Sequence, residues 1–128
     1  MNKRKSLILV GALFTSALLS TEAGAATKIS NGISCTAKQK NTTKTQVTKD
    51  VTDKYVCTTN PTAIGSAKTK LVWVNQDCLD MDGFYKSDVA ALAKLKLDTT
   101  ATATQISTQV ANVDAQKTWR SLACAKGY

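Results

Sequence analysis

Beyond the first 25 residues, the densest run of apolar and aromatic positions lies within residues 68–75, where LVWV occupies positions 71–74 without a polar interruption. A short unbroken apolar run of this kind is typical of a strand that is buried on both faces. The pattern therefore predicts a central strand over residues 68–75, with the indole of Trp73 in the core.

The residues before this run are rich in threonine, a β-branched residue that favours strands over helix interiors. Apolar and polar positions alternate over residues 33–37, which predicts a further strand. Residues 46–57 are ambiguous. Val47, Val51 and Tyr55 fit one face of a strand by alternation and one face of a helix by their spacing of four. The β-branched content favours the strand, and the helix stays the alternative.

The residues after the central strand predict a loop and then helices. Residues 78–85 surround the dipeptide Asp82-Gly83, and we interpret them as a loop. Ser87 is suited to cap a helix that continues through good helix formers and breaks at residues 98–100.

A last helix is predicted over about residues 101–124, and it carries apolar residues on two sides. The stripes are Ile106, Val110 and Val113 on one face and Ala111, Ala115, Trp119 and Leu122 on roughly the opposite face. Two such stripes indicate either a kink near Asp114 or a helix that is covered on both sides.

These elements predict an α+β fold, in which a small antiparallel sheet packs against one or two C-terminal helices. The sheet would combine strands from the first half of the chain with residues 71–75. A mostly α fold is the alternative, if residues 46–57 are helical.

The N-terminal residues have the pattern of a signal peptide. Residues 1–5 are basic, residues 6–20 are apolar, and an Ala-Gly-Ala sequence at 23–25 fits a cleavage site. The apolar run is shorter than the roughly 20 residues that span a bilayer. We therefore predict a signal peptide over 1–25 and a single exported domain over 26–128, in the periplasm or outside a bacterial cell, without a transmembrane segment after cleavage.

All four cysteines, Cys35, Cys57, Cys78 and Cys124, fall in the predicted mature domain. An even number of cysteines in a small exported protein indicates two disulfides. We favour Cys35–Cys57 with Cys78–Cys124, because each pair closes one half of the chain. The pairing of Cys57 with Cys78 and of Cys35 with Cys124 is the rival. Leu, Ile, Val and Phe make up only 19 of the 103 mature residues, so we expect reduction to unfold the protein.

The composition excludes several kinds of catalysis. The chain has no histidine, and its one glutamate, Glu22, lies in the predicted signal peptide. Ser-His-Asp and Cys-His sites need an imidazole, and zinc hydrolysis needs histidine or free thiolate ligands. We therefore predict no catalytic residue, no cofactor and no metal. The alternative is a secreted effector or hydrolase that uses the aspartates from Asp77 to Asp82.

Charge is distributed unevenly. Residues 26–70 carry a net charge of +6, whereas residues 71–128 carry none. This basic half is either a solvated surface or a salt-sensitive contact with an anionic envelope surface. The candidate contacts are Lys38, Lys40, Lys44, Lys49 and Lys54. Nucleic acid is disfavoured, because the mature chain has one arginine and few aromatic residues.

The other candidate surface lies near the C-terminus and comprises Lys117, Trp119, Arg120 and Leu122. Trp119 would either anchor a partner or cover the region of Cys78 and Cys124. We therefore predict a small, exported, disulfide-stabilised, non-enzymatic protein–protein interaction module of the cell envelope, such as an inhibitor, an immunity-type protein or an assembly-accessory protein. Its expected partner is another envelope or secreted protein.

Overall fold

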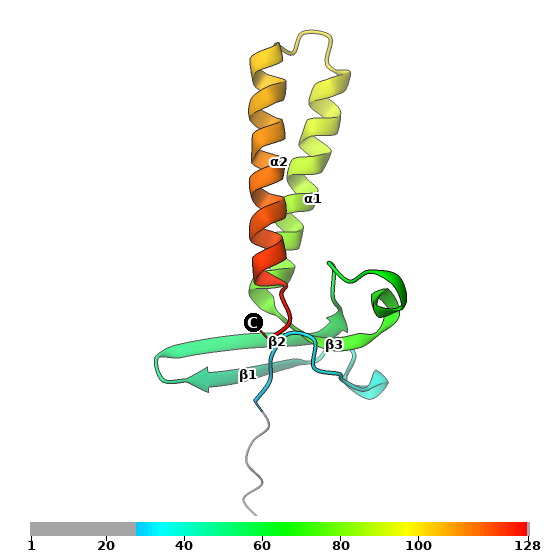
Figure 1. Ribbon diagram of the computed structural model, residues 1–128, viewed down its shortest axis with the longest axis vertical. Coiled ribbons are helices and arrows are strands. Elements are labelled where there is room, and N and C mark those ends of the chain that lie inside the picture. The colour runs from blue at the N-terminus through cyan, green and yellow to red at the C-terminus, as the bar shows by residue number, and fades with distance from the viewer. Residues whose placement is uncertain (1–27, 128) are drawn as a thin grey trace, which may run out of the picture.

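A two-helix hairpin projects from a small sheet in the computed structural model, which describes residues 28–127 (Figure 1). The predicted signal peptide, residues 1–25, lies outside the described residues. The elements are η1 (Ala37–Gln39), β1 (Thr43–Thr48), β2 (Val51–Thr59), η2 (Gly65–Thr69), β3 (Leu71–Asn75), α1 (Gln76–Leu97) and α2 (Ala103–Ala123). The α+β prediction, with an antiparallel sheet against C-terminal helices, is confirmed.

The sheet has the strand order β1-β2-β3, and both pairings are antiparallel. Residues 46–57 are neither one strand nor a helix. They form the end of β1, a turn at Lys49-Asp50, and most of β2, because Thr48 pairs with Val51 across the turn. Lys49 adopts a positive φ of 50° to make this reversal. The strand interpretation was therefore correct in kind but missed the turn.

The strand predicted over 33–37 is not formed: residues 32–35 meet the free edge of β3 only through an isolated bridge between Ser34 and Val72, and η1 begins at Ala37. The Trp73 amide donates to the Ile33 carbonyl at 2.7 Å, and the Cys35 amide donates to the Leu71 carbonyl at 3.2 Å. The prediction of a central strand over 68–75 is therefore wrong in two respects: β2 is the middle strand of the sheet, and β3 begins only at Leu71, because residues 65–69 form η2.

The two faces of the sheet are buried by different parts of the chain. Tyr55, Cys57 and Trp73 lie on one face and pack against the N-terminal segment around Ile33. Val74 lies on the other face and packs against the root of the helical hairpin. Trp73 is 3% exposed and Val74 is fully buried, so the predicted strand buried on both faces is confirmed.

The disulfides are Cys35–Cys57 and Cys78–Cys124, which is the favoured pairing. The first ties the N-terminal segment to β2, and the second ties the start of α1 to the end of α2. For sequence separations of 22 and 46 residues, loop closure predicts stabilisation of about 3 and about 4 kcal/mol. Both values are large against a total stability of about 5–15 kcal/mol for a typical domain.

The predicted loop over 78–85 and the predicted helix start at Ser87 are wrong. α1 begins directly after β3, where the Asn75 side chain caps it by accepting from the Asp77 amide at 2.8 Å. Gly83 lies inside the helix at a cost of about 1 kcal/mol relative to alanine. Contacts of Cys78 and Asp82 with α2 offset this cost, and neither contact is visible in the local sequence.

α2 is one continuous helix, and a Thr102–Gln105 capping box starts it. Ile106 and Val113 are half-buried on its inner side, but the outer stripe is exposed, and the expectation of a kink near Asp114 or of cover on both sides is wrong. Within residues 28–127, neither helix is long and apolar enough to cross a membrane.

The turn between the helices is held by Asp98, which ends α1 as predicted. Its carboxylate accepts from the Thr100 hydroxyl at 2.6 Å and from the Thr100 amide at 2.8 Å. These two bonds hold the pKa of Asp98 below its ordinary value, and the bond from the hydroxyl has the larger effect.

Candidate interaction surface on the helical hairpin

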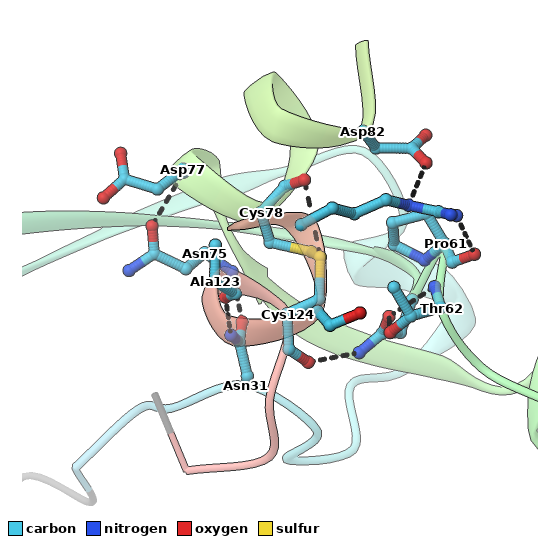
Figure 2. The surroundings of a disulfide bond; sticks show 12 residues. Asn31, Pro61, Thr62, Asn75, Asp77, Cys78, Asp82, Ala123 and Cys124 are labelled. Carbon is cyan, nitrogen blue, oxygen red and sulfur yellow. Dashed lines mark hydrogen bonds and ion pairs between the residues drawn. A yellow bond between two sulfur atoms is a disulfide. The ribbon is translucent and has the colours of Figure 1, made fainter. Parts of the chain in front are cut away.

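The root of the hairpin is fastened to the sheet by a buried asparagine (Figure 2). The Asn31 side chain donates to the Ala123 carbonyl at 2.8 Å and accepts from the Asn75 amide at 2.6 Å. Asn31 is 1% exposed, so both bonds are shielded from water. One side chain thus joins the N-terminal segment, the start of α1 and the end of α2.

Arg120 braces the hairpin from the inside. Its Nε lies 2.7 Å from the Asp82 carboxylate, and its Nη2 donates to the Pro61 carbonyl at 2.7 Å. Figure 2 shows these two partners, Asp82 and Pro61, near the Cys78–Cys124 disulfide. The Nε–H is not aligned as a hydrogen bond to that carboxylate oxygen, so the contact is ionic. The guanidinium also lies over the Tyr85 ring, 4.7 Å from its centroid.

The residues predicted for the interface therefore differ in how far they are exposed to a partner. The Arg120 side chain is only 18% exposed and is engaged within the protein, so it presents little surface to a partner. Trp119 is 61% exposed and Leu122 is 55% exposed. Lys117 is also exposed, and it borders a shallow depression of about 480 Å³ that includes Leu122 but not Trp119. Trp119 and Leu122 are three residues apart on the exposed stripe of α2, whereas Lys117 is turned about 160° round the helix from Trp119.

Phe84 joins Trp119 on one broad side of the hairpin, although a loop rather than a helix was predicted at Phe84. Phe84 immediately precedes Tyr85, and Trp119 immediately precedes Arg120. Tyr85 and Arg120 touch across the seam between the helices. An antiparallel helix pair has approximate two-fold symmetry, so residues one step before the seam emerge on the same side, about 100° round each helix. Phe84 is 54% exposed, and the two rings therefore flank one side of the seam.

This side, here called the aromatic face, has a distinctive charge. On α1 the spacing of three or four residues places Asp77, Asp80 and Asp88 in a row with Phe84. α2 contributes the uncharged residues Thr108, Asn112, Ala115 and Trp119. Neither row contains a lysine or an arginine. The nearest cation in the α1 sequence, Lys94, is turned about 80° further round the helix from Phe84.

The opposite broad side, here called the basic face, carries the cations. Lys86 follows Tyr85 in α1, and Lys117 lies on the corresponding side of α2, with Lys96 nearer the tip. Asp114, on α2, is the acidic residue on this side that lies away from the contact between the two helices. The hairpin therefore presents one acidic, aromatic face and one basic face, although residues 71–128 have no net charge.

The aspartates from Asp77 to Asp82 do not converge on one point. Asp77 and Asp80 are exposed on the aromatic face, and Asp80 accepts from the Gln76 side chain at 2.8 Å. Asp82 is buried and is paired with Arg120 and Lys86. In the described part of the chain, no group of three His, Cys, Asp or Glu side chains is placed to hold a metal ion.

The five lysines proposed for contact with an anionic surface are spread out. The Lys44 ammonium lies 4.8 Å from the centre of the Trp73 ring. Lys44 pairs with Tyr55, so the side chain of the neighbouring Lys54 points to the other face of the sheet. Lys38 lies in η1, Lys40 follows it, and Lys49 lies at the β-turn. The lysines thus do not share one face of the sheet.

No protein-family model, curated protein or solved structure matches the chain. The class of protein is defined by its own fold, a small disulfide-stabilised α+β domain with a projecting helical hairpin.

Proposed function

We propose that this protein is an exported, non-enzymatic protein–protein interaction module of the cell envelope, which binds its partner through the helical hairpin. The observation that carries the proposal is the pair of exposed aromatic side chains, Phe84 and Trp119, on one side of a braced scaffold. Roles such as inhibitor, immunity-type protein or assembly-accessory protein all fit such a module.

The aromatic pair is a suitable binding centre on energetic grounds. Aromatic side chains bury about 150–250 Å² each, so two half-exposed rings offer about 200 Å² to a partner. At about 25 cal/mol per Å², covering them contributes about 5 kcal/mol before the entropic cost of association. Aromatic residues of this kind dominate interface energetics. Contacts of the partner with the residues around the two rings would add to this binding free energy.

The scaffold supports the same proposal. The Cys78–Cys124 disulfide, the buried Asn31 and the Asp82–Arg120 ion pair fix the hairpin root. A surface that is already ordered loses less conformational entropy on binding. The absence of histidine, and of glutamate beyond Glu22, supports a role without catalysis. The scattered lysines give an anionic-surface binder less support.

Photo-crosslinking in the producing cell tests the proposal. A photoreactive amino acid replaces Trp119 in one variant and Lys117 in a matched control, two residues away on the basic face. We expect a discrete crosslinked product from position 119 and little or none from position 117. Crosslinking of neither position, or equal crosslinking of both, would contradict a partner on this side of the hairpin.

A further inference from the structure

We infer that the aromatic face binds a basic amphipathic helix of a partner protein, in which lysine or arginine residues flank an aliphatic residue. This inference rests on the proposed function and specifies the chemistry of the partner. It follows from two features of the face, the exposed rings and the carboxylates of Asp80 and Asp88 on either side of Phe84; Asp77, at the sheet end of the row, shares a hollow with Lys54 of β2.

The rings set the apolar part of the partner. Phe84 and Trp119 flank the seam between two antiparallel helices, and an aliphatic side chain that lies over the seam would contact both rings. A helix is the element whose apolar stripe fits such a seam, since helices pack with their ridges in the grooves of other helices. The surface therefore favours a partner that presents leucine, isoleucine or methionine along one helical face.

The carboxylates set the charged part. Asp80 lies four residues before Phe84 and Asp88 lies four residues after it, so each is about 6 Å along the helix axis from the aromatic position. Asp88 accepts from the Gln109 side chain through Oδ1, which leaves Oδ2 for a further donor. Two cations about 12 Å apart, that is, seven or eight residues apart on a helix, would meet both carboxylates with the aliphatic residue between them.

The charge contributes more to selectivity than to affinity. An exposed ion pair adds little to affinity, because its charges are screened by water and salt. Three carboxylates in a row repel an acidic partner and an anionic lipid surface, and they attract a cationic segment over distances of about a Debye length. The rings supply the burial, and the aspartates decide which helices reach them.

The test uses the oxidised protein, labelled with ¹⁵N, and two synthetic helical peptides of identical leucine pattern. One peptide carries lysines eight residues apart around a central leucine, and the other carries glutamates in their place. We expect the lysine peptide to shift the amide resonances around Phe84 and Trp119, with a Kd that rises at least threefold between 50 and 300 mM salt. The glutamate peptide is expected not to bind.

Paired variants connect the binding to the face. Phe84→Ser with Trp119→Ser is expected to weaken binding of the lysine peptide at least tenfold. Val89→Ser with Val110→Ser, two comparably exposed apolar residues towards the basic face, is the matched control and is expected to leave the Kd within twofold. Each variant is first checked for an unchanged fold by its amide spectrum.

The outcomes separate the inference from the proposed function. Equal binding of the two peptides, resonance shifts confined to the basic face, or no binding of the lysine peptide at 1 mM would overturn the inference. A photo-crosslinked partner from position 119 whose contact segment is acidic would also overturn it, while leaving the interaction module in place. Absence of any crosslink, together with binding of neither peptide, would remove both.

Discussion

Replacing Gly83 by alanine is expected to stabilise the protein. Gly83 lies within α1, its φ is not positive, and a methyl group added at its Cα would meet nothing within 4 Å. Alanine is about 0.8–1.0 kcal/mol more favourable than glycine in an exposed helix interior. We therefore expect the free energy of unfolding to rise by about 1 kcal/mol and the Tm to rise by about 4–8 °C for a domain of this size.

Gly65→Ala is the matched control, because Gly65 has a positive φ and Gly83 does not. A methyl group there also meets nothing within 4 Å, but Gly65 has a φ of +57°. An L-residue in this left-handed conformation costs about 1–2 kcal/mol. The same chemical change should therefore lower the free energy of unfolding at position 65 and raise it at position 83.

Urea denaturation followed by circular dichroism, with the disulfides intact, measures both variants. The sign at position 83 is decisive. If Asp82-Gly83 lay in a loop, as the local sequence predicts, and Gly83 adopted a positive φ there, alanine would destabilise the protein. A fall in the midpoint for Gly83→Ala, or an equal shift in both variants, would refute the continuous helix.

Three other measurements probe the scaffold. Asp82→Ala leaves the mostly buried Arg120 without its ionic partner and is expected to lower the free energy of unfolding by about 2–4 kcal/mol. Lys86→Ala removes the 72%-exposed partner of the same carboxylate and should lower it by less than about 0.5 kcal/mol. Similar losses in the two variants would contradict a bracing role for the Asp82–Arg120 pair. Asn31→Ala leaves two buried backbone groups unpaired at about 1–3 kcal/mol each, and an unchanged unfolding midpoint would argue against this junction. The pKa of Asp98 is lowered by the threonine hydroxyl and amide that bind it. Its stabilisation is therefore present above the unfolded value of about 3.9 and is lost as the pH falls through the folded pKa, and an NMR titration midpoint at or above 3.9 would be inconsistent with this.

The sheet and the disulfides could be predicted because the strand is specified by its own residues and the cysteines allow few pairings. The apolar run at 71–74 specifies burial on both faces whatever surrounds it. Four cysteines allow only three pairings, and the pairing that closes each half of the chain is the observed one. The turn inside residues 46–57 was missed because Lys49, rather than glycine or asparagine, occupies the position of positive φ.

The start of α1 could not be predicted, because its support comes from distant residues. Asp82-Gly83 is a turn signal by itself. Within the fold, Asp82 meets Arg120, which is 38 residues further along the chain, and Cys78 meets Cys124. Because a loop was predicted over residues 78–85, Phe84 was not assigned to a helix. Its position on the same side of the hairpin as Trp119 therefore could not be predicted. The same long-range ion pair turns Arg120 inward, away from the surface that its sequence neighbours suggested.

The most direct test of the central claim is the identity of the segment that touches the aromatic face in the cell. A photoreactive residue at position 84, and in a second variant at position 119, is crosslinked in the producing cell, and the attached peptide is sequenced by mass spectrometry. We expect one partner segment, captured from both positions, with lysine or arginine seven or eight residues apart around an aliphatic residue. An acidic segment, or different partners from the two positions, would contradict it.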